Sequence, residues 1–203
     1  MKTIRKILLV VAALAAAELA GVRAAVNAGE RAPDFGATDL EGRSWRLSDY
    51  KGRIVVLEWV NPGCPFVRKH YDSGNIPRLQ QRATGDGVVW LSVNSGHAGA
   101  QGDLDEKAAA AWLKKKGAAP TAYVRDREGR IGRLYGAAAT PHLFVIDEHG
   151  VVVYRGAIDS IRSADPEDIA RATNYVSVAL ADLRAGRPIE KPNTQPYGCA
   201  VHY

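Results

Sequence analysis

The sequence predicts one α/β domain in which helices cover both faces of a mixed central sheet. Residues 54–60 and 88–93 are apolar, β-branched runs of the length that buried central strands have, and helical sequence follows each of them. Nearer the C-terminus, two short apolar runs flank the turn residues 147–150, a pattern typical of an antiparallel hairpin. Two parallel strand–helix units followed by a hairpin and a last helix give a sheet of mixed strand direction.

The first 24 residues differ in composition from the rest of the chain. A basic start is followed by an unbroken apolar run of 11 residues, 7–17, and then by small residues. That run is too short to span a bilayer and has the length of a signal-peptide core. We therefore expect a signal peptide at residues 1–24, cleaved after Ala24 or Ala28, and a periplasmic or secreted domain. An uncleaved N-terminal anchor is the alternative.

The remaining elements follow from apolar runs, helix formers and the residues that begin and end them. The predicted order is strand 54–60, helix 65–82, strand 88–93, helix 104–116, strands 121–124, 143–146 and 151–155, and a helix from about 165 to 184. Pro65 suits the first turn of its helix, and Gly117 suits the end of the next one. Residues 25–185 are thus expected to form the domain, with a tail at 186–203.

The charge pattern gives no indication of nucleic-acid binding. The whole chain carries a formal net charge of +5, and more than half of this charge lies in the predicted signal peptide. The short basic run 114–116 ends a predicted helix, where cations interact favourably with the helix dipole. We expect no nucleic-acid partner and no stable membrane insertion after cleavage.

Two cysteines, Cys64 and Cys199, are the residues with the most informative chemistry. In an oxidising compartment such a pair usually forms a disulfide or performs thiol chemistry. Cys64 stands between a buried strand and a helix, where backbone N–H groups and the helix dipole stabilise a thiolate. The basic residues 68–70 would add to this effect if they face the sulfur. The alternative is a buried, inert structural cysteine.

Four sequence features together resemble the redoxin group. They are the entry segment 32–52 with Ala32-Pro33-Asp34-Phe35, Cys64 after the first central strand, Ala139-Thr140-Pro141 before a strand, and Pro196-Tyr197-Gly198-Cys199 in the tail. The chain is similar over residues 31–203 to exported, AhpC/TSA-like members of the thioredoxin-like family, in the thiol-disulfide oxidoreductase branch. This resemblance implies a thioredoxin-like fold and a redox-active centre at Cys64.

The resemblance also gives roles to two further residues. Glu58 is an acid within an apolar strand, where burial without a partner is costly. In thioredoxins an acid at this offset from the nucleophile assists proton transfer, so Glu58 is a candidate acid/base; simple pairing with a Lys or Arg is the alternative. Pro141 resembles the cis-proline that faces the cysteine and lets an extended substrate pair beside it; an ordinary trans proline is the alternative.

The chain departs from both standard catalytic sites of these families. Val67 stands where a thioredoxin has its second cysteine, while Asn61 and Leu57 stand where a peroxiredoxin has threonine and proline. Asn61 still offers a side-chain hydrogen bond near the thiolate. The missing resolving thiol is then expected to be Cys199, through a Cys64–Cys199 bridge that is a redox couple, a permanent staple or a link between two chains.

We therefore expect an exported thiol-disulfide oxidoreductase that acts on protein or small-molecule disulfides and takes electrons from a thiol donor. A peroxidase with antioxidant activity, acting through a Cys64 sulfenic acid, is the closest alternative. Metal binding by Cys199 and His202, joined by Cys64 and His70, is a third and weaker possibility. No cofactor is expected.

The other histidines and two tryptophans have no assigned role in this chemistry. We expect His97, His142 and His149 to be polar surface or loop residues, with His142 notable because it follows Pro141. Trp59 and Trp90 lie in predicted strands and are expected in the core.

Overall fold

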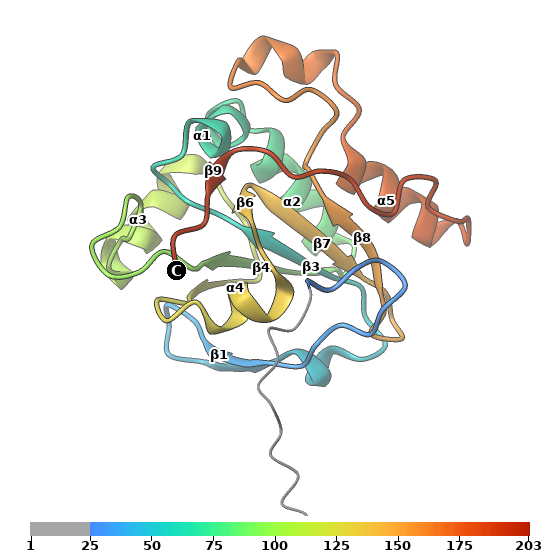
Figure 1. Cartoon of the computed structure of the whole chain (residues 1–203), viewed down its shortest axis with the longest axis horizontal. Coiled ribbons are helices and arrows are strands. Elements are labelled where there is room, and N and C mark those ends of the chain that lie inside the picture. Colours follow the sequence, from blue (N-terminus) through green and yellow to red (C-terminus); the bar gives the residue numbers. More distant parts are fainter. Residues whose placement is uncertain (1–24) are drawn as a thin grey trace, which may run out of the picture.

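The computed structural model describes residues 25–203, so the predicted signal peptide at 1–24 lies outside the described part. Its centre is a five-stranded sheet in the order β5-β4-β3-β7-β8 (Figure 1). The strands are β3 (Val55–Trp59), β4 (Val89–Asn94), β5 (Ala122–Arg125), β7 (His142–Ile146) and β8 (Val152–Gly156). The first three are parallel, and β7 and β8 form an antiparallel hairpin whose first strand pairs with β3. The predicted mixed sheet is confirmed.

Helices and two smaller sheets surround this centre. The helices are α1 (Pro65–Asp72), α2 (Asn75–Gly85), α3 (Glu106–Lys116), α4 (Arg130–Tyr135) and α5 (Tyr175–Arg184), with 3-10 turns at Leu47–Tyr50 and Pro166–Ala170. β1 (Gly36–Thr38) pairs with β2 (Ser44–Arg46), and β6 (Ala139–Thr140) pairs with β9 (Cys199–Ala200). No helix within residues 25–203 combines the length and apolar character that crossing a bilayer requires.

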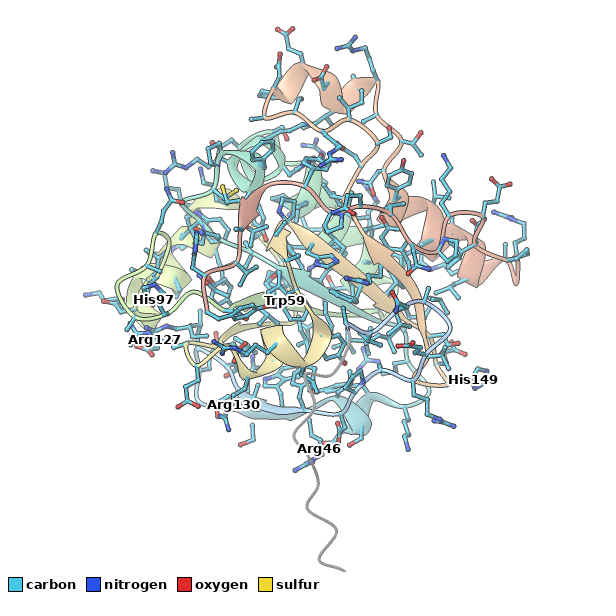
Figure 2. The ribbon with its side chains drawn as sticks, viewed as in Figure 1. Arg46, Trp59, His97, Arg127, Arg130 and His149 are labelled. Atoms are coloured by element: carbon cyan, nitrogen blue, oxygen red, sulfur yellow. The ribbon has the colours of Figure 1, made fainter. Side chains whose placement is uncertain are left out.

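The core has two parts because side chains alternate between the faces of a strand. On one face Val56 of β3 and Val60, which follows this strand, meet apolar residues of α1, α2, α3 and α5. On the other, Leu57 and Trp59 meet α4 and the β1–β2 hairpin. Trp59 and Trp90 are fully buried, as expected, and Figure 2 shows Trp59 in the interior. Each face of the sheet is therefore covered.

Two predicted helices are interrupted. The stretch expected to run from 65 to 82 breaks at Gly74, whose φ of +72° belongs to the left-handed region, and the chain restarts as α2. The stretch expected from 165 to 184 forms only a 3-10 turn before α5 begins at Tyr175. Asn174 ends the interruption because its side chain accepts from the N–H of Ser177 and thereby caps α5.

The tail crosses back over the domain after α5. It first runs beside β8, where Arg155 N–H donates to the carbonyl of Pro192 at 2.8 Å and Thr194 N–H donates to the carbonyl of Arg155 at 2.9 Å. It then pairs as β9 with β6, placing Cys199 opposite Thr140. Figure 1 shows this red segment passing over the end of β6 before the C-terminus. The tail thus pairs with β6 and passes beside Cys64.

Candidate active site

Cys64 lies where the sequence predicts it, between β3 and α1. A turn over residues 61–63 leads into it, with Cys64 N–H donating to the carbonyl of Asn61 at 3.0 Å. Pro65 follows as the first residue of α1, so Cys64 is the N-cap. The side chain nevertheless has no exposed surface. The strand-to-helix corner is present, but the tail covers it.

The Cys64 sulfur lies between the loop before β7 and the tail. Its thiol donates to the carbonyl of Thr140 at 3.1 Å, and the Cys199 N–H donates to it at 3.4 Å. The Thr140–Pro141 peptide bond is cis, as the resemblance implies. Both cysteines are free thiols in this structure. The chain therefore brings the predicted pair into contact without a disulfide between them.

The pKa values of the two thiols are shifted in opposite directions. Burial opposes ionisation of Cys64, but hydrogen bonds from the Cys199 thiol and from backbone N–H groups of Val67 and Cys199 outweigh it and lower the pKa of Cys64. Burial and the neighbouring Cys64 raise the pKa of Cys199 to about 12. Cys64 is therefore the sulfur that ionises first, and Cys199 acts as its hydrogen-bond donor.

Glu58 is fully buried behind this site and is held by neutral donors. Its Oε1 accepts from Tyr71 at 2.8 Å, and its Oε2 accepts from Gln80 at 2.9 Å, Trp90 at 2.8 Å and Ser92 at 3.1 Å. Burial raises the pKa of Glu58 despite these bonds. Within the described residues, no Lys or Arg pairs with Glu58, and no hydrogen bond joins it to the Cys64 sulfur. Two of its partners, Tyr71 and Trp90, nevertheless lie in the same core cluster as Cys64.

Asn61 faces its own turn rather than the sulfur. Its Oδ1 accepts from the N–H of Gly63 at 2.8 Å, and a Cβ on Gly102 would lie 1.8 Å from this oxygen. The amide therefore shapes the loop that carries Cys64, and it makes no hydrogen bond to the thiol.

The basic residues after Cys64 do not surround it. Arg68 is exposed, and its Nε donates to the carbonyl of Pro62 at 3.3 Å. Lys69 and His70 are buried and lie 3.5 Å and 3.7 Å, respectively, from Oδ2 of Asp159. The sequence left open whether these residues face the sulfur. The structure directs Lys69 and His70 to Asp159, a buried acid after β8 for which Lys69 is the counter-charge.

The sequence reasoning missed Asp159 and Tyr197 as site residues. Tyr197 donates its hydroxyl proton to Oδ1 of Asp159, and the same oxygen accepts from the N–H of Ile161 at 3.1 Å. Tyr197 precedes Cys199 by two positions, so this acid anchors the part of the tail that reaches the active site. The sequence signals are an acid soon after the predicted strand 151–155 and the position of Tyr197 in the tail motif with Cys199.

The remaining histidines form no common site. His97 and His149 are exposed and lie at opposite sides of the molecule in Figure 2. His142 is fully buried against Phe144, and burial lowers its pKa to about 3. The expectation of a surface or loop residue is wrong for His142 because β7 carries it into the core. Among residues 25–203, no group of three or more His, Cys, Asp or Glu side chains is arranged to hold a metal ion.

Comparison with known proteins identifies the family. The model of the AhpC/TSA family matches residues 28–155. The thiol-disulfide oxidoreductase ResA of Geobacillus thermodenitrificans is 31% identical over 131 residues, which are 64% of this chain and 69% of that protein.

Two solved structures share the fold. An uncharacterised conserved protein of Geobacillus kaustophilus has a TM-score of 0.73 and 26% identity, covering 87% of this chain and 92% of that one. The exposed lipoprotein thioredoxin Etrx1 of Streptococcus pneumoniae has a TM-score of 0.50 and 26% identity, covering 68% of this chain and 96% of that one. The chain therefore belongs to the AhpC/TSA family, with the thioredoxin-like fold and the thiol-disulfide oxidoreductase class that the sequence predicts.

Proposed function

We propose that this chain is an exported thiol-disulfide oxidoreductase in which Cys64 is the nucleophile and Cys199 is the resolving cysteine. The observation that carries the proposal is the contact between the two: the Cys199 N–H lies 3.4 Å from the Cys64 sulfur, although 135 positions separate them. The ordering of the two pKa values supports the division of roles.

The proposed reaction has two exchange steps. The Cys64 thiolate attacks one sulfur of a substrate disulfide, forms a mixed disulfide and expels the other sulfur as a thiolate. Cys199 then loses its proton to that thiolate and attacks the Cys64 sulfur, so the Cys64–Cys199 disulfide forms and the second substrate thiolate leaves. Two electrons pass to the substrate, and an external thiol donor returns them to the cysteine pair.

Three further residues have proposed supporting roles. Glu58 is proposed to exchange a proton through its hydroxyl partners Tyr71 and Ser92, and its raised pKa supports this role. Asn61 holds the loop that positions Cys64. Pro141 and the residue before it present the edge on which the tail lies.

Trapping of the mixed disulfide tests the division of roles. The reduced full-length domain is mixed with glutathione disulfide and analysed by mass spectrometry. We expect the unmodified sequence to yield the Cys64–Cys199 disulfide, Cys199→Ser to stop as a glutathione adduct on Cys64, and Cys64→Ser to remain unmodified at that position. Equal turnover by Cys199→Ser and the unmodified sequence would remove Cys199 from the mechanism.

Glu58→Gln tests the proton-transfer role. If Glu58 acts as acid/base, the rate of adduct formation falls and its pH profile shifts, while the variant keeps the far-UV spectrum of the unmodified protein. An unchanged pH profile and rate would leave Glu58 a structural residue.

Peroxide is the alternative oxidant. It would convert the Cys64 thiolate to a sulfenic acid and hydroxide, and Cys199 would then form the disulfide with loss of water. We expect peroxide to oxidise the pair far more slowly than glutathione disulfide does, because Asn61 and Leu57 replace the threonine and proline of a peroxiredoxin site. Faster oxidation by peroxide would reverse the assignment.

Export is the remaining part of the proposal. The sequence pattern of residues 1–24 supports it, as does the likeness to a pneumococcal protein described as an exposed lipoprotein thioredoxin. N-terminal sequencing of protein recovered outside the cytoplasm is expected to begin at Ala25 or Gly29. Recovery of Met1 on the folded protein would contradict cleavage.

A further inference from the structure

Tyr197 fills a closed polar pocket that disulfide exchange by itself does not require. Its side chain is 5% exposed, and its ring lies edge-on to Phe66 with the centroids 5.8 Å apart. The ammonium of Lys69 lies 6.0 Å from the ring centroid. At the closed end, the hydroxyl meets His70 and Asp159. The pocket therefore combines an aromatic wall, a cation and two hydrogen-bonding groups.

The polarity of these groups matches a phenol. The Asn75 amide nitrogen lies 2.8 Å from Nδ1 of His70, and because an amide nitrogen only donates, Nδ1 accepts. In the neutral ring the proton then sits on Nε2, which lies 3.4 Å from the Tyr197 oxygen. The Tyr197 hydroxyl proton goes to Asp159. The Tyr197 hydroxyl thus accepts from Nε2 of His70 and donates to Asp159.

At the next position of the tail, residue 198, steric constraints allow only glycine. Gly198 has a φ of +134°, and a Cβ on it would lie 2.0 Å from the carbonyl oxygen of Thr140. The obstacle is backbone, so no small rotation of a side chain would make room. β9 then places Cys199 opposite Thr140 and against the Cys64 sulfur. Three consecutive positions are therefore specified: an aromatic hydroxyl, a glycine and a cysteine.

These residues belong to the tail segment 197–200, which also covers the nucleophile. Cys64 has no exposed surface, so a substrate sulfur reaches it only after residues 197–200 move away. The β6–β9 ladder that holds them is only two residues long on each strand. A segment able to make the same contacts would compete directly with the tail for this edge.

We infer that the pocket of Phe66, Lys69, His70 and Asp159 is a recognition site for a tyrosine of the protein substrate. The partner is an extended segment with the sequence Tyr-Gly-Cys whose cysteine is in a disulfide, and the tail's own Tyr197-Gly198-Cys199 is the resident occupant that it displaces. This inference rests on the proposed function and specifies its substrate class.

The exchange of occupants fits the chemistry of the two steps. While the substrate segment lies on β6, Cys64 attacks its cysteine, the substrate S–S bond breaks and the partner sulfur leaves as a thiolate. When the tail returns, the Cys199 sulfur attacks Cys64, the mixed disulfide breaks and the segment leaves with its sulfur reduced. The thiolate that leaves in the first step takes the proton from Cys199. Each cycle of the tail thus transfers two electrons and one proton to the substrate disulfide.

Peptide disulfides test the inference in full-length domains that retain Cys64 alone. The probes are Pro-Tyr-Gly-Cys-Ala, Pro-Phe-Gly-Cys-Ala, Pro-Ala-Gly-Cys-Ala and Pro-Tyr-Val-Cys-Ala, each linked through its cysteine to thionitrobenzoate. Attack by Cys64 releases the coloured thiolate and gives the rate. The hosts are Cys199→Ser, in which the tail keeps Tyr197, and Tyr197→Ala with Cys199→Ser, in which the pocket is vacated.

In the vacated host we expect the Tyr-Gly-Cys peptide to react at least about tenfold faster than the Ala-Gly-Cys and Tyr-Val-Cys peptides, with Phe-Gly-Cys between them. We also expect every peptide to react at least about tenfold more slowly in the host that keeps Tyr197, since opening of the tail then precedes attack. Equal rates for the four peptides would overturn recognition, and equal rates in the two hosts would overturn displacement.

A third host protects the test against misfolding. Tyr197→Phe with Cys199→Ser keeps the ring and removes only the hydroxyl, and it should give rates between those of the other two hosts. Iodoacetamide labelling of Cys64 distinguishes access to the sulfur from its reaction with a disulfide. If labelling is faster in the vacated host but no peptide releases thionitrobenzoate, the proposed disulfide exchange fails while tail gating of Cys64 stands.

Discussion

Two buried acids on the same face of the sheet, Glu58 and Asp159, are held in different ways. Helix α1 supplies partners to both: Tyr71 donates to Glu58, while Lys69 and His70 turn to Asp159. All partners of Glu58 are neutral and lie within the domain. Asp159 has a buried cation and a tyrosine from the tail.

This difference separates a closed site from one that depends on a movable segment. None of the hydrogen bonds of Glu58 involves a residue of the tail. Those of Asp159 change when Tyr197 leaves, and a carboxylate beside a buried ammonium then faces the vacated pocket. Asp159 therefore contacts both α1 and the tail that covers Cys64, whereas Glu58 contacts no residue of the tail.

The largest expected effect is from Asp159→Asn. This change leaves the Lys69 ammonium buried without its carboxylate, so we expect the free energy of unfolding to fall by about 3–5 kcal/mol. Urea denaturation measures it. The matched control is Glu128→Gln, which breaks an exposed pair with Arg130 and should cost less than about 1 kcal/mol. Adding Lys69→Met to Asp159→Asn should recover part of the loss; a loss no larger than the control's would contradict the role of the pair.

The next effect is the acid sensitivity of the Asp159 cluster. Burial lowers the pKa of His70 to about 4, with Lys69 acting in the same direction and Asp159 opposing. Because the folded pKa is below that of the unfolded chain, this stability is present above pH 6.5 and is lost as the pH falls to about 4. The full loss is about 3 kcal/mol.

Denaturation at pH 7, 5 and 4 checks this prediction. His70→Gln should remove the part of the stability loss at low pH that comes from His70. His142→Gln serves as the comparison because the pKa of His142, on the other face of the sheet, is also lowered. An unchanged pH slope in His70→Gln would show that His70 takes up its proton without cost to the fold.

Glu58→Gln should show the opposite pH trend and a smaller effect. The amide leaves donors of Tyr71, Gln80, Trp90 and Ser92 poorly matched, which costs about 1–3 kcal/mol at pH 4.5. Since burial raises the folded pKa of Glu58, its contribution is present below pH 4.5 and is lost as the pH rises. The difference between variant and unmodified protein should therefore shrink towards pH 8. A difference that grows with pH would mean that the carboxylate, not the acid, is the buried form.

The smallest effect on overall stability is expected from Tyr197→Phe. The ring still packs on Phe66, and Asp159 keeps its bond from Ile161, so unfolding should change by about 1 kcal/mol or less. The loss should instead appear in local opening of the tail. Hydrogen exchange of the Cys199 and Val201 amides is expected to accelerate about fivefold. Exchange at the rate of the unmodified protein would show that the hydroxyl does not hold the tail.

Local patterns predicted much of the fold. The strands β3, β4, β7 and β8 and the helix α3 lie within a few residues of their predicted positions, because buried runs and caps are encoded by adjacent residues. The breaks at Gly74 and Asn174 were missed although turn and capping residues mark them, Ser73-Gly74-Asn75 at the first and Thr173-Asn174 at the second. The short elements β6 and β9 were missed because their pairing joins segments 59 positions apart, and neither has a pattern of its own.

The candidate site was predicted in its chemistry more than in its arrangement. The sequence indicated Cys64, Cys199 and Glu58 because each is an unusual residue in its local setting, and the resemblance to the redoxin group indicated Pro141. It did not indicate Asp159, whose importance depends on side chains from α1 and the tail.

The sequence by itself determined which sulfur stands at a helix N-terminus after a buried strand, and it determined that the neighbouring second thiol is replaced by Val67. Only the tertiary structure decided that the tail covers this sulfur, that Cys199 lies against it, and that Tyr197 is seated on Asp159. The reason is physical: capping and strand burial act between near neighbours in the chain, whereas a buried charge is satisfied by whatever the fold brings within hydrogen-bonding distance.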